Sequence, residues 1–214
     1  MNTKKRILSY LLKLTVIFAV IVGVWQAAVL RGSSAFMYFT IQSNILIAII
    51  CAIGLFLMAK KQKISDAWFT FKFVGTVAIT LTGVVFCFIL APNLDLAWGL
   101  SNTLTHVVVP VAAILDFFVT GTQGNLSKKD VLWVTLPPSL YTIYAAIGYV
   151  QNWSFDEGYN FPYFFFNWGS PAGAFGFTKE LPFMGTAWWI LVLLIFLIIV
   201  GFLYLAIIKR LRKI

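Results

Sequence analysis

The sequence predicts an all-α membrane protein, a bundle of six transmembrane helices with both termini in the cytoplasm. The chain of 214 residues is 61% hydrophobic. Its apolar residues gather in six runs, each about 20 residues long, which is the length that a helix needs to cross roughly 30 Å of hydrocarbon. Basic residues gather at alternate ends of these runs, and this bias sets the expected orientation.

The runs form one membrane domain, 1–214. Backbone groups in lipid must pair with one another, so only helices or a closed barrel can span a bilayer. The apolar character is continuous instead of alternating, which selects helices. The first run follows a basic start, as in a signal peptide, but it is too long for a typical h-region, so we expect it to be retained. We place the helices near 7–30, 37–59, 69–91, 100–120, 131–150 and 186–208.

The distribution of basic residues predicts the orientation, because Lys and Arg favour short cytoplasmic loops. The cytoplasmic groups comprise Lys4, Lys5, Arg6 and Lys13; Lys60, Lys61, Lys63 and Lys72; Lys128 and Lys129; and Lys209, Arg210, Arg212 and Lys213. Only Arg31 and Lys179 fall on the other side. The net charge of +9 then reflects this bias and attraction to anionic lipid. Basic residues dispersed at helix ends do not suit a nucleic-acid partner. We expect the protein to lie in the plasma membrane.

The sequence predicts no cofactor. Cys51 and Cys87 fall at different depths of neighbouring helices, farther apart than a disulfide allows, so we expect two packing residues. No cysteine pattern suggests a metal site. Haem ligation by His106 would need a second ligand that the sequence does not obviously supply.

The loop 151–185 is long and rich in aromatic residues. Loops of this length are usually functional or disordered, and the aromatic density argues against disorder. Two interpretations stand. The loop is either an interfacial belt of Trp and Tyr at headgroup level, or a lid or re-entrant segment over a lipid-accessible site, in which Gly169, Pro171, Gly173 and Gly176 prevent a regular helix.

Two polar concentrations stand out within the apolar runs. His106 is the single histidine, and an ionisable side chain at membrane depth is costly enough to indicate a functional site. The second concentration is Thr40-Ile41-Gln42-Ser43-Asn44, early in the helix 37–59. Both helices run inward from their outer ends. Thr40 and His106 are therefore predicted at similar depth, roughly 5 to 10 Å below the outer boundary.

Residues three or four apart share one side of a helix, so two polar stripes can be assigned. The stripes comprise Thr40, Ser43, Asn44 and Ile47 on one helix, and Asn102, His106, Pro110 and Ala113 on the other. Pro110 has no N–H, so we expect a kink and a freed carbonyl at His106 that can orient a substrate, a water or a side chain. We expect a pocket near Thr40 and His106 with few polar groups.

The chemistry that fits these residues is a hydroxyl nucleophile beside a base. His106 would take the proton of Thr40 as its oxygen attacks an ester carbonyl, giving an acyl-enzyme that water resolves. Donors to the oxyanion would come from Gln42, Ser43, Asn44 or Asn102. The alternative is that these side chains only tie helices together, at about 0.6 kcal/mol per hydrogen bond.

A resemblance favours the first interpretation. The segments Phe39-Thr40-Ile41-Gln42-Ser43-Asn44 and Thr105-His106-Val107-Val108-Val109-Pro110, continuing to Leu115-Asp116, resemble the two signature segments of the androgen-induced and androgen-dependent transmembrane protein family and its bacterial relatives. Phe161-Pro162-Tyr163-Phe164 resembles an aromatic-proline motif of the bacterial members. The resemblance implies a multi-pass threonine hydrolase of fatty acid esters of hydroxy fatty acids, with Thr40 as nucleophile and His106 as the second catalytic residue.

Asp116 lies about 15 Å deeper than His106 by helical rise, too far to orient it. It is interpreted as a polar tie between helices or, in the minority view, as part of a proton or ion path. A second class therefore stays open: a small transporter, channel or receptor-like lipid-binding protein whose Thr40, His106 and Asp116 form a polar path. A hydrolase would have a blind outer pocket instead of a through path. The expected partners are a lipid ester substrate and membrane lipids, and the sequence does not indicate an oligomeric state.

Overall fold

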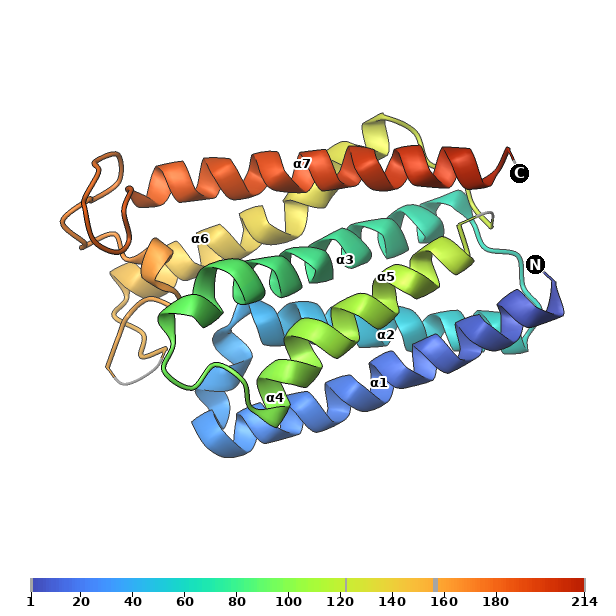
Figure 1. Ribbon diagram of the computed structural model, residues 1–214, viewed down its shortest axis with the longest axis horizontal. Helices are drawn as coiled ribbons and strands as arrows, with labels where there is room; N and C mark the ends of the chain where they lie inside the picture. Colours follow the sequence, from blue (N-terminus) through green and yellow to red (C-terminus); the bar gives the residue numbers. More distant parts are fainter. Residues whose placement is uncertain (1, 122, 156–157, 214) are drawn as a thin grey trace.

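The computed structural model describes residues 2–121, 123–155 and 158–213. Within these ranges it is a helical bundle with six helical spans that are long and apolar enough to cross a membrane, so the protein is an integral multi-pass membrane protein and the predicted fold is confirmed (Figure 1). The α-helices are α1 Thr3–Arg31, α2 Phe39–Ala59, α3 Asp66–Val85, α4 Leu100–Thr103, α5 Val109–Val119, α6 Leu136–Val150 and α7 Thr186–Leu211.

Short helical segments of other types accompany the α-helices, and all except the one in the loop 151–185 extend them into full spans. Two are π-helical, η2 Phe86–Leu90 after α3 and η4 Leu104–Val108 between α4 and α5. The others are 3-10 helices: η1 Gly32–Met37, η3 Ala91–Asn93, η5 Lys129–Thr135 and η6 Phe164–Phe166. The fourth span is thus α4, η4 and α5 in succession, and the predicted site residue His106 lies inside its π-helical turn.

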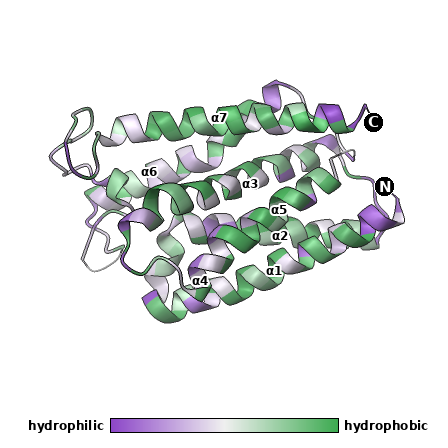
Figure 2. Ribbon diagram, in the orientation of Figure 1, coloured by the Kyte–Doolittle hydropathy of each residue, from purple (hydrophilic) through white to green (hydrophobic). Residues whose placement is uncertain are grey.

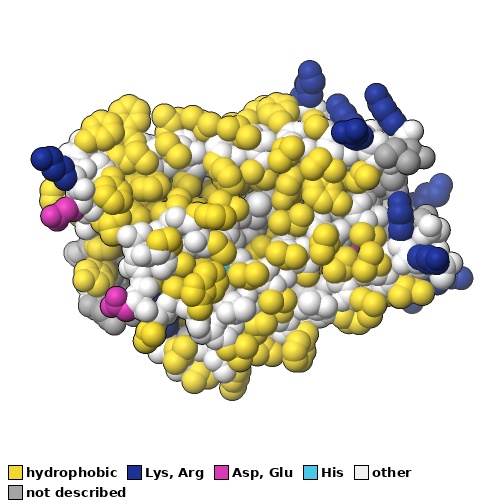
Figure 3. All heavy atoms as spheres, viewed as in Figure 1, with side chains coloured by type: hydrophobic (Ala, Val, Ile, Leu, Met, Phe, Trp, Pro, Cys, Tyr) yellow, Lys and Arg dark blue, Asp and Glu magenta, His cyan; other side chains and the backbone are white. Residues whose placement is uncertain are grey.

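Both termini lie at one end of the bundle, and the loop between α6 and α7 covers the other end (Figure 1). Hydrophobic residues predominate along the helices (Figure 2), and apolar side chains make up most of the face drawn in Figure 3, where Lys and Arg gather at the end that holds the termini. Large outward side chains such as Phe18 and Trp25, 70% and 71% exposed, suit a surface that faces lipid. The basic cluster at the terminal end fits the predicted cytoplasmic side.

Helix α3 lies at the centre, where it packs against α2, α5, α7 and η5. Its inner end carries Phe69 and Phe73, both fully buried. Their ring centroids lie 5.5 and 5.8 Å from that of Phe117 on α5, so aromatic packing joins the two helices. Cys51 and Cys87 are both free thiols, as expected.

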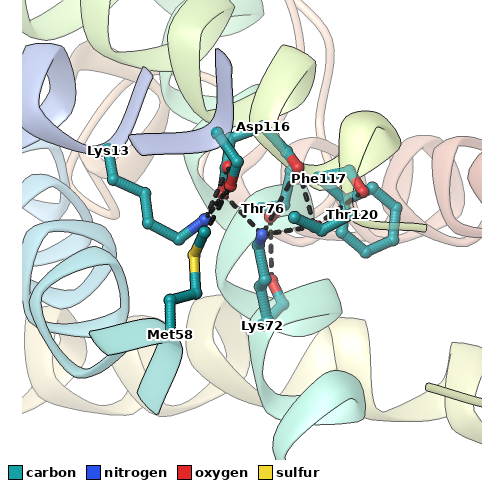
Figure 4. Close-up of polar contacts among 8 residues, drawn as sticks. Lys13, Met58, Lys72, Thr76, Asp116, Phe117 and Thr120 are labelled. Atoms are coloured by element: carbon teal, nitrogen blue, oxygen red, sulfur yellow. Dashed lines mark hydrogen bonds and ion pairs between the residues drawn. The ribbon is translucent and has the colours of Figure 1, made fainter. Parts of the chain in front are cut away.

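One part of the charge assignment was wrong: Lys13 and Lys72 do not lie at the cytoplasmic helix ends. Both side chains are buried and reach Asp116 of α5 from α1 and α3 (Figure 4). Lys13 Nζ lies 2.6 Å from Asp116 Oδ1, and Lys72 Nζ lies 2.5 Å from Asp116 Oδ2. The polar-tie interpretation of Asp116 fits this arrangement, since buried charges persist when they are paired.

Candidate functional site

Thr40 and His106, which lie 66 positions apart in the chain, are in contact. Thr40 Oγ1 lies 3.2 Å from His106 Nε2, which is hydrogen-bond distance. Thr40 is in the first turn of α2, and His106 is in η4. The structure therefore brings the predicted nucleophile and the predicted base together at the outer end of the bundle.

The second ring nitrogen of His106 determines which tautomer the histidine holds. His106 Nδ1 lies 3.0 Å from the backbone oxygen of Asn102 and 3.1 Å from Thr105 Oγ1. A carbonyl oxygen can only accept, and the single hydroxyl proton of Thr105 is already donated to Ser101 O at 2.8 Å. Both neighbours of Nδ1 are therefore acceptors, so Nδ1 carries the proton. Nε2 is left with a lone pair that faces the Thr40 hydroxyl.

The ring of His106 is held from one side by Phe86. The two rings stack with centroids 3.7 Å apart and planes 16° apart. Each residue lies in a π-helical turn that precedes a proline, Pro92 for Phe86 and Pro110 for His106. A proline has no N–H to donate to the carbonyl four residues before it, as an α-helix requires. In a π-helical turn an N–H donates instead to the carbonyl five residues before it. The carbonyl of His106, expected to be free for a ligand, instead faces Gly83 of α3.

Asn44 and Ser43 hold the two polar segments in register. Asn44 Nδ2 donates to the carbonyl of Thr40 at 2.8 Å and to that of Thr105 at 3.1 Å, which joins α2 to η4. Ser43 Oγ lies 2.7 Å from Thr82 Oγ1 of α3. The donors of both side chains are thus engaged by the protein, so their geometry suits positioning better than the expected contact with an oxyanion.

The other two predicted supporting residues also direct their amides elsewhere. Gln42 is exposed and donates to the carbonyl of Phe36 at 3.1 Å, so it does not join the Thr40 and His106 pair. Asn102 donates to the carbonyl of Ala97 at 2.8 Å. Asn102 nevertheless contributes, because its backbone oxygen is the acceptor for His106 Nδ1.

Tyr163 completes the site from the loop between α6 and α7. The backbone N–H of Thr40 donates to the Tyr163 hydroxyl at 3.4 Å, and Thr40 Oγ1 lies 3.5 Å from the same oxygen. Burial raises the pKa of Tyr163 above its ordinary value, so the phenol stays protonated and able to donate. The sequence reasoning assigned Tyr163 no role. The signal that could have marked Tyr163 as a site residue was the motif Phe161-Pro162-Tyr163-Phe164.

The loop between α6 and α7 lies against the site and lines both of its cavities. Phe155, Phe165 and Phe166 are buried, and the ring of Tyr163 stacks on Phe165 with centroids 5.1 Å apart. In the described part of 151–185 the only helical turn is η6, and Gly173 adopts a positive φ of 55°. This placement fits the lid interpretation, because the loop's aromatic packing carries Tyr163 to Thr40.

Thr40 lies between two cavities. The wider one, of about 520 Å³, is lined by Thr40 and His106 and by apolar side chains such as Phe86 and Leu94, with more polar groups than the sequence suggested. Its polar lining includes Arg31, Asn93, Ser101, Asn102 and Tyr159. The narrower one, of about 50 Å³, has an almost wholly apolar lining from α3, α6 and α7.

Asp116 is separated from this site by apolar packing. Between it and His106 on the same span, Val109, Ala112 and Ala113 are buried in one cluster with residues of α1, α2 and α3. The Thr40 and His106 pair and the Asp116 ion pairs therefore lie at different depths of the bundle.

Comparison with protein-family models, with curated proteins and with solved structures found no match to this chain.

Proposed function

We propose that the protein is an intramembrane hydrolase of lipid esters, with Thr40 as the nucleophile and His106 as the base. The observation that carries the proposal is the contact of 3.2 Å between Thr40 Oγ1 and an Nε2 that the partners of Nδ1 leave unprotonated. A hydroxyl in contact with a correctly oriented base is the usual arrangement for nucleophilic catalysis.

In the first half of the reaction Thr40 Oγ1 attacks the carbonyl carbon of the ester, and its proton passes to His106 Nε2. The tetrahedral intermediate then collapses. The bond to the alcohol oxygen breaks, His106 returns the proton to that oxygen, and the alcohol leaves an acyl group on Thr40.

In the second half water attacks the acyl group. His106 Nε2 takes a proton from the water, the bond to Thr40 Oγ1 breaks, and the proton passes to that oxygen as the carboxylic acid is released. One ester and one water thus give one alcohol and one acid, and the enzyme returns to its starting state.

Two groups favour the negative charge of the intermediate. Thr40 lies in the first turn of α2, where backbone N–H groups lack intrahelical acceptors and the helix dipole favours an anion. The hydroxyl of Tyr163 lies 3.5 Å from Thr40 Oγ1 and can donate to the former carbonyl oxygen of an ester under attack at Thr40, which is the oxygen that carries the charge. We assign Tyr163 the role that the sequence interpretation gave to Gln42, Ser43, Asn44 or Asn102.

The setting supports a lipid substrate. The pair lies within the outer part of a bundle whose long sides are apolar, so esters of fatty acids reach it from the bilayer. The resemblance of the segments around Thr40 and His106 to a family of threonine hydrolases favours the same chemistry. We place the protein in the plasma membrane, with the basic terminal end in the cytoplasm.

The alternative, a conducting polar path through Thr40, His106 and Asp116, has less support. The apolar cluster around Val109 and Ala112 interrupts that path, and both carboxylate oxygens of Asp116 are engaged by lysines.

Labelling with a fluorophosphonate that carries a fatty chain tests the proposal. The wild-type protein should be labelled, and the Thr40→Ala variant, folded to the same thermal stability, should not. Equal labelling of the two proteins would end the assignment of Thr40 as nucleophile.

A further inference from the structure

We propose that the narrow cavity between α3, α6 and α7 binds the acyl chain of the ester, and that the wide cavity binds the alcohol portion. This inference rests on the proposed function and adds the direction in which the substrate lies. Its first support is that the two cavities meet at the same residues. Thr40 and Tyr163 line both cavities, so an ester carbonyl held at Thr40 has one cavity on each side.

The lining of the narrow cavity selects an apolar guest. Its walls include Leu81 and Val85 of α3 and Ile190, Leu193 and Leu194 of α7. A polymethylene chain gains free energy there, at about 0.8 kcal/mol per buried methylene group.

The few polar side chains in this lining already have protein partners. Thr82 Oγ1 lies 2.7 Å from Ser43 Oγ, and Thr142 Oγ1 donates to the carbonyl of Pro138 at 2.9 Å. The Tyr141 hydroxyl donates to the carbonyl of Met37 at 3.1 Å. Apart from Thr40 and Tyr163 at one end of the cavity, every hydroxyl group in its lining is therefore already hydrogen-bonded to the protein. A polar guest would lose its hydrogen bonds with water and gain few in return.

The wide cavity carries more polar groups, beside apolar side chains such as Phe86, Leu94 and Phe161. Arg31 lies on its wall, with its guanidinium 5.1 Å from the centre of the Tyr38 ring, and the side chains of Asn93 and Ser101 lie nearby. Its volume of about 520 Å³ suits a bulky, hydrated group better than a single hydrocarbon chain.

Membrane lipid can supply the chain directly. Thr142 on α6 and Ile190, Leu193 and Leu194 on α7 are each partly exposed, so the narrow cavity is not sealed from the surrounding bilayer. An acyl chain can therefore enter sideways between α6 and α7, while the alcohol portion stays toward the outer end.

The experiment narrows the cavity at one residue and measures chain-length preference. Purified full-length protein in lipid nanodiscs is given nitrophenyl esters of acids from butyryl to palmitoyl, and kcat/KM is measured for each. Leu194→Phe should lower the ratio of palmitoyl to butyryl turnover by about tenfold or more, as expected when a pocket loses room for several methylene groups. Leu191→Phe, the same change on the lipid-facing side of α7 at a residue that is 47% exposed, should leave the ratio unchanged.

A second ester series tests the direction. Butyryl esters of alcohols of increasing length should show no change of profile in Leu194→Phe. If Leu194→Phe instead suppresses long alcohols, the substrate lies the other way round, and the inference is overturned. It is also overturned if wild type and Leu194→Phe have the same profile in both series.

Two further proteins separate the possible failures. If Leu194→Phe does not fold, Leu194→Ala should widen the cavity and raise the relative turnover of methyl-branched acyl esters, and an unchanged ratio overturns the inference. Thr40→Val serves as the blank. If wild type hydrolyses no ester faster than Thr40→Val, the proposed function itself fails and the acyl-chain assignment falls with it.

Discussion

Gly83 of α3 lies directly against the backbone oxygen of His106: a Cβ at position 83 would come within 2.9 Å of that oxygen and within 3.2 Å of the Pro110 ring. A backbone atom cannot move aside as the tip of a flexible side chain can. The absence of a side chain at Gly83 therefore sets where the π-helical turn lies and how far His106 stands from Thr40.

Gly83→Ala should displace His106 and impair both folding and turnover. Overpacking of this kind costs about 1 to 3 kcal/mol, and a catalytic group moved by about 1 Å can lose about 100-fold in rate. Thermal unfolding in detergent and ester hydrolysis measure the two effects. Gly99→Ala is the matched control, because a Cβ there meets no heavy atom within 4 Å. A Gly83→Ala protein with normal stability and rate would show that the close approach does not matter.

Thr40→Val and His106→Ala should each abolish ester turnover while the protein stays folded. Valine keeps the shape of threonine and removes only the attacking oxygen. The double variant should be little worse than either single one, since the two groups act as a unit. If Thr40 only ties helices together, Thr40→Val would cost about 1 kcal/mol of stability and spare the activity. Hydrolysis of a long-chain ester and thermal unfolding, measured on the same samples, distinguish these outcomes.

Tyr163→Phe should lower kcat by about 100- to 1000-fold if the phenol donates to the oxyanion, which is the usual effect of losing one such donor. The KM should change less. Tyr10→Phe, at the opposite end of the bundle on α1, provides the control. A Tyr163→Phe enzyme with normal kcat would return the oxyanion role to the backbone N–H groups at the start of α2.

The raised pKa of Tyr163 predicts a pH dependence of stability. The folded state holds the phenol in its protonated form more firmly than the unfolded chain does, where the pKa is about 10. The stabilisation is therefore complete below about pH 10 and is lost as the pH rises from there through the folded-state pKa. The melting temperature of wild type minus that of Tyr163→Phe should be constant at lower pH and should fall in the alkaline range. A wild type that becomes more stable relative to Tyr163→Phe above about pH 10 would contradict this assignment.

Asp116→Ala should destabilise the bundle by about 3 to 5 kcal/mol, because it leaves Lys13 and Lys72 buried without their counter-ion. Replacing all three residues with apolar ones of similar size should restore most of the stability. Thermal unfolding measures both, and Asp95→Ala, at an exposed position, is the control. An Asp116→Ala protein as stable as wild type would mean that the pairs contribute nothing.

The sequence was sufficient to predict the six spans and that Thr40 and His106 lie at the same level of the bundle, because run length and helical rise are local quantities. It did not show that Lys13 and Lys72 face inward. A lysine a few residues inside a helix end looks the same in sequence whether it extends to the surface or pairs with a distant carboxylate. The structure shows that Gly54 leaves room for the inward side chain of Lys13, since a Cβ at position 54 would lie 2.8 Å from Lys13 Cε.

Helical periodicity did not predict the roles of Tyr163 and Phe86 for a related reason, although a motif resemblance marked the segment of Tyr163. Both act through contacts between segments far apart in the chain, and neither belongs to a polar stripe. Three of the four predicted supporting residues, Ser43, Asn44 and Asn102, do lie at or next to the pair, but their donors are engaged by neighbouring protein atoms. Periodicity can place a side chain on a face, yet it cannot say which acceptor that side chain will find there.

The position of Tyr163 in the loop between α6 and α7 has a consequence for biosynthesis. Thr40 and His106 belong to the first four of the six spans and emerge from the ribosome early, while Phe164 and Phe165, next to Tyr163, pack against Trp189 of α7, which is made later. A nascent chain thus carries the proposed nucleophile and base into the membrane before α7 supports Tyr163. Under the proposed function, lipid cleavage at full rate would begin only once translation has delivered α7, so the onset of activity would follow the order of synthesis.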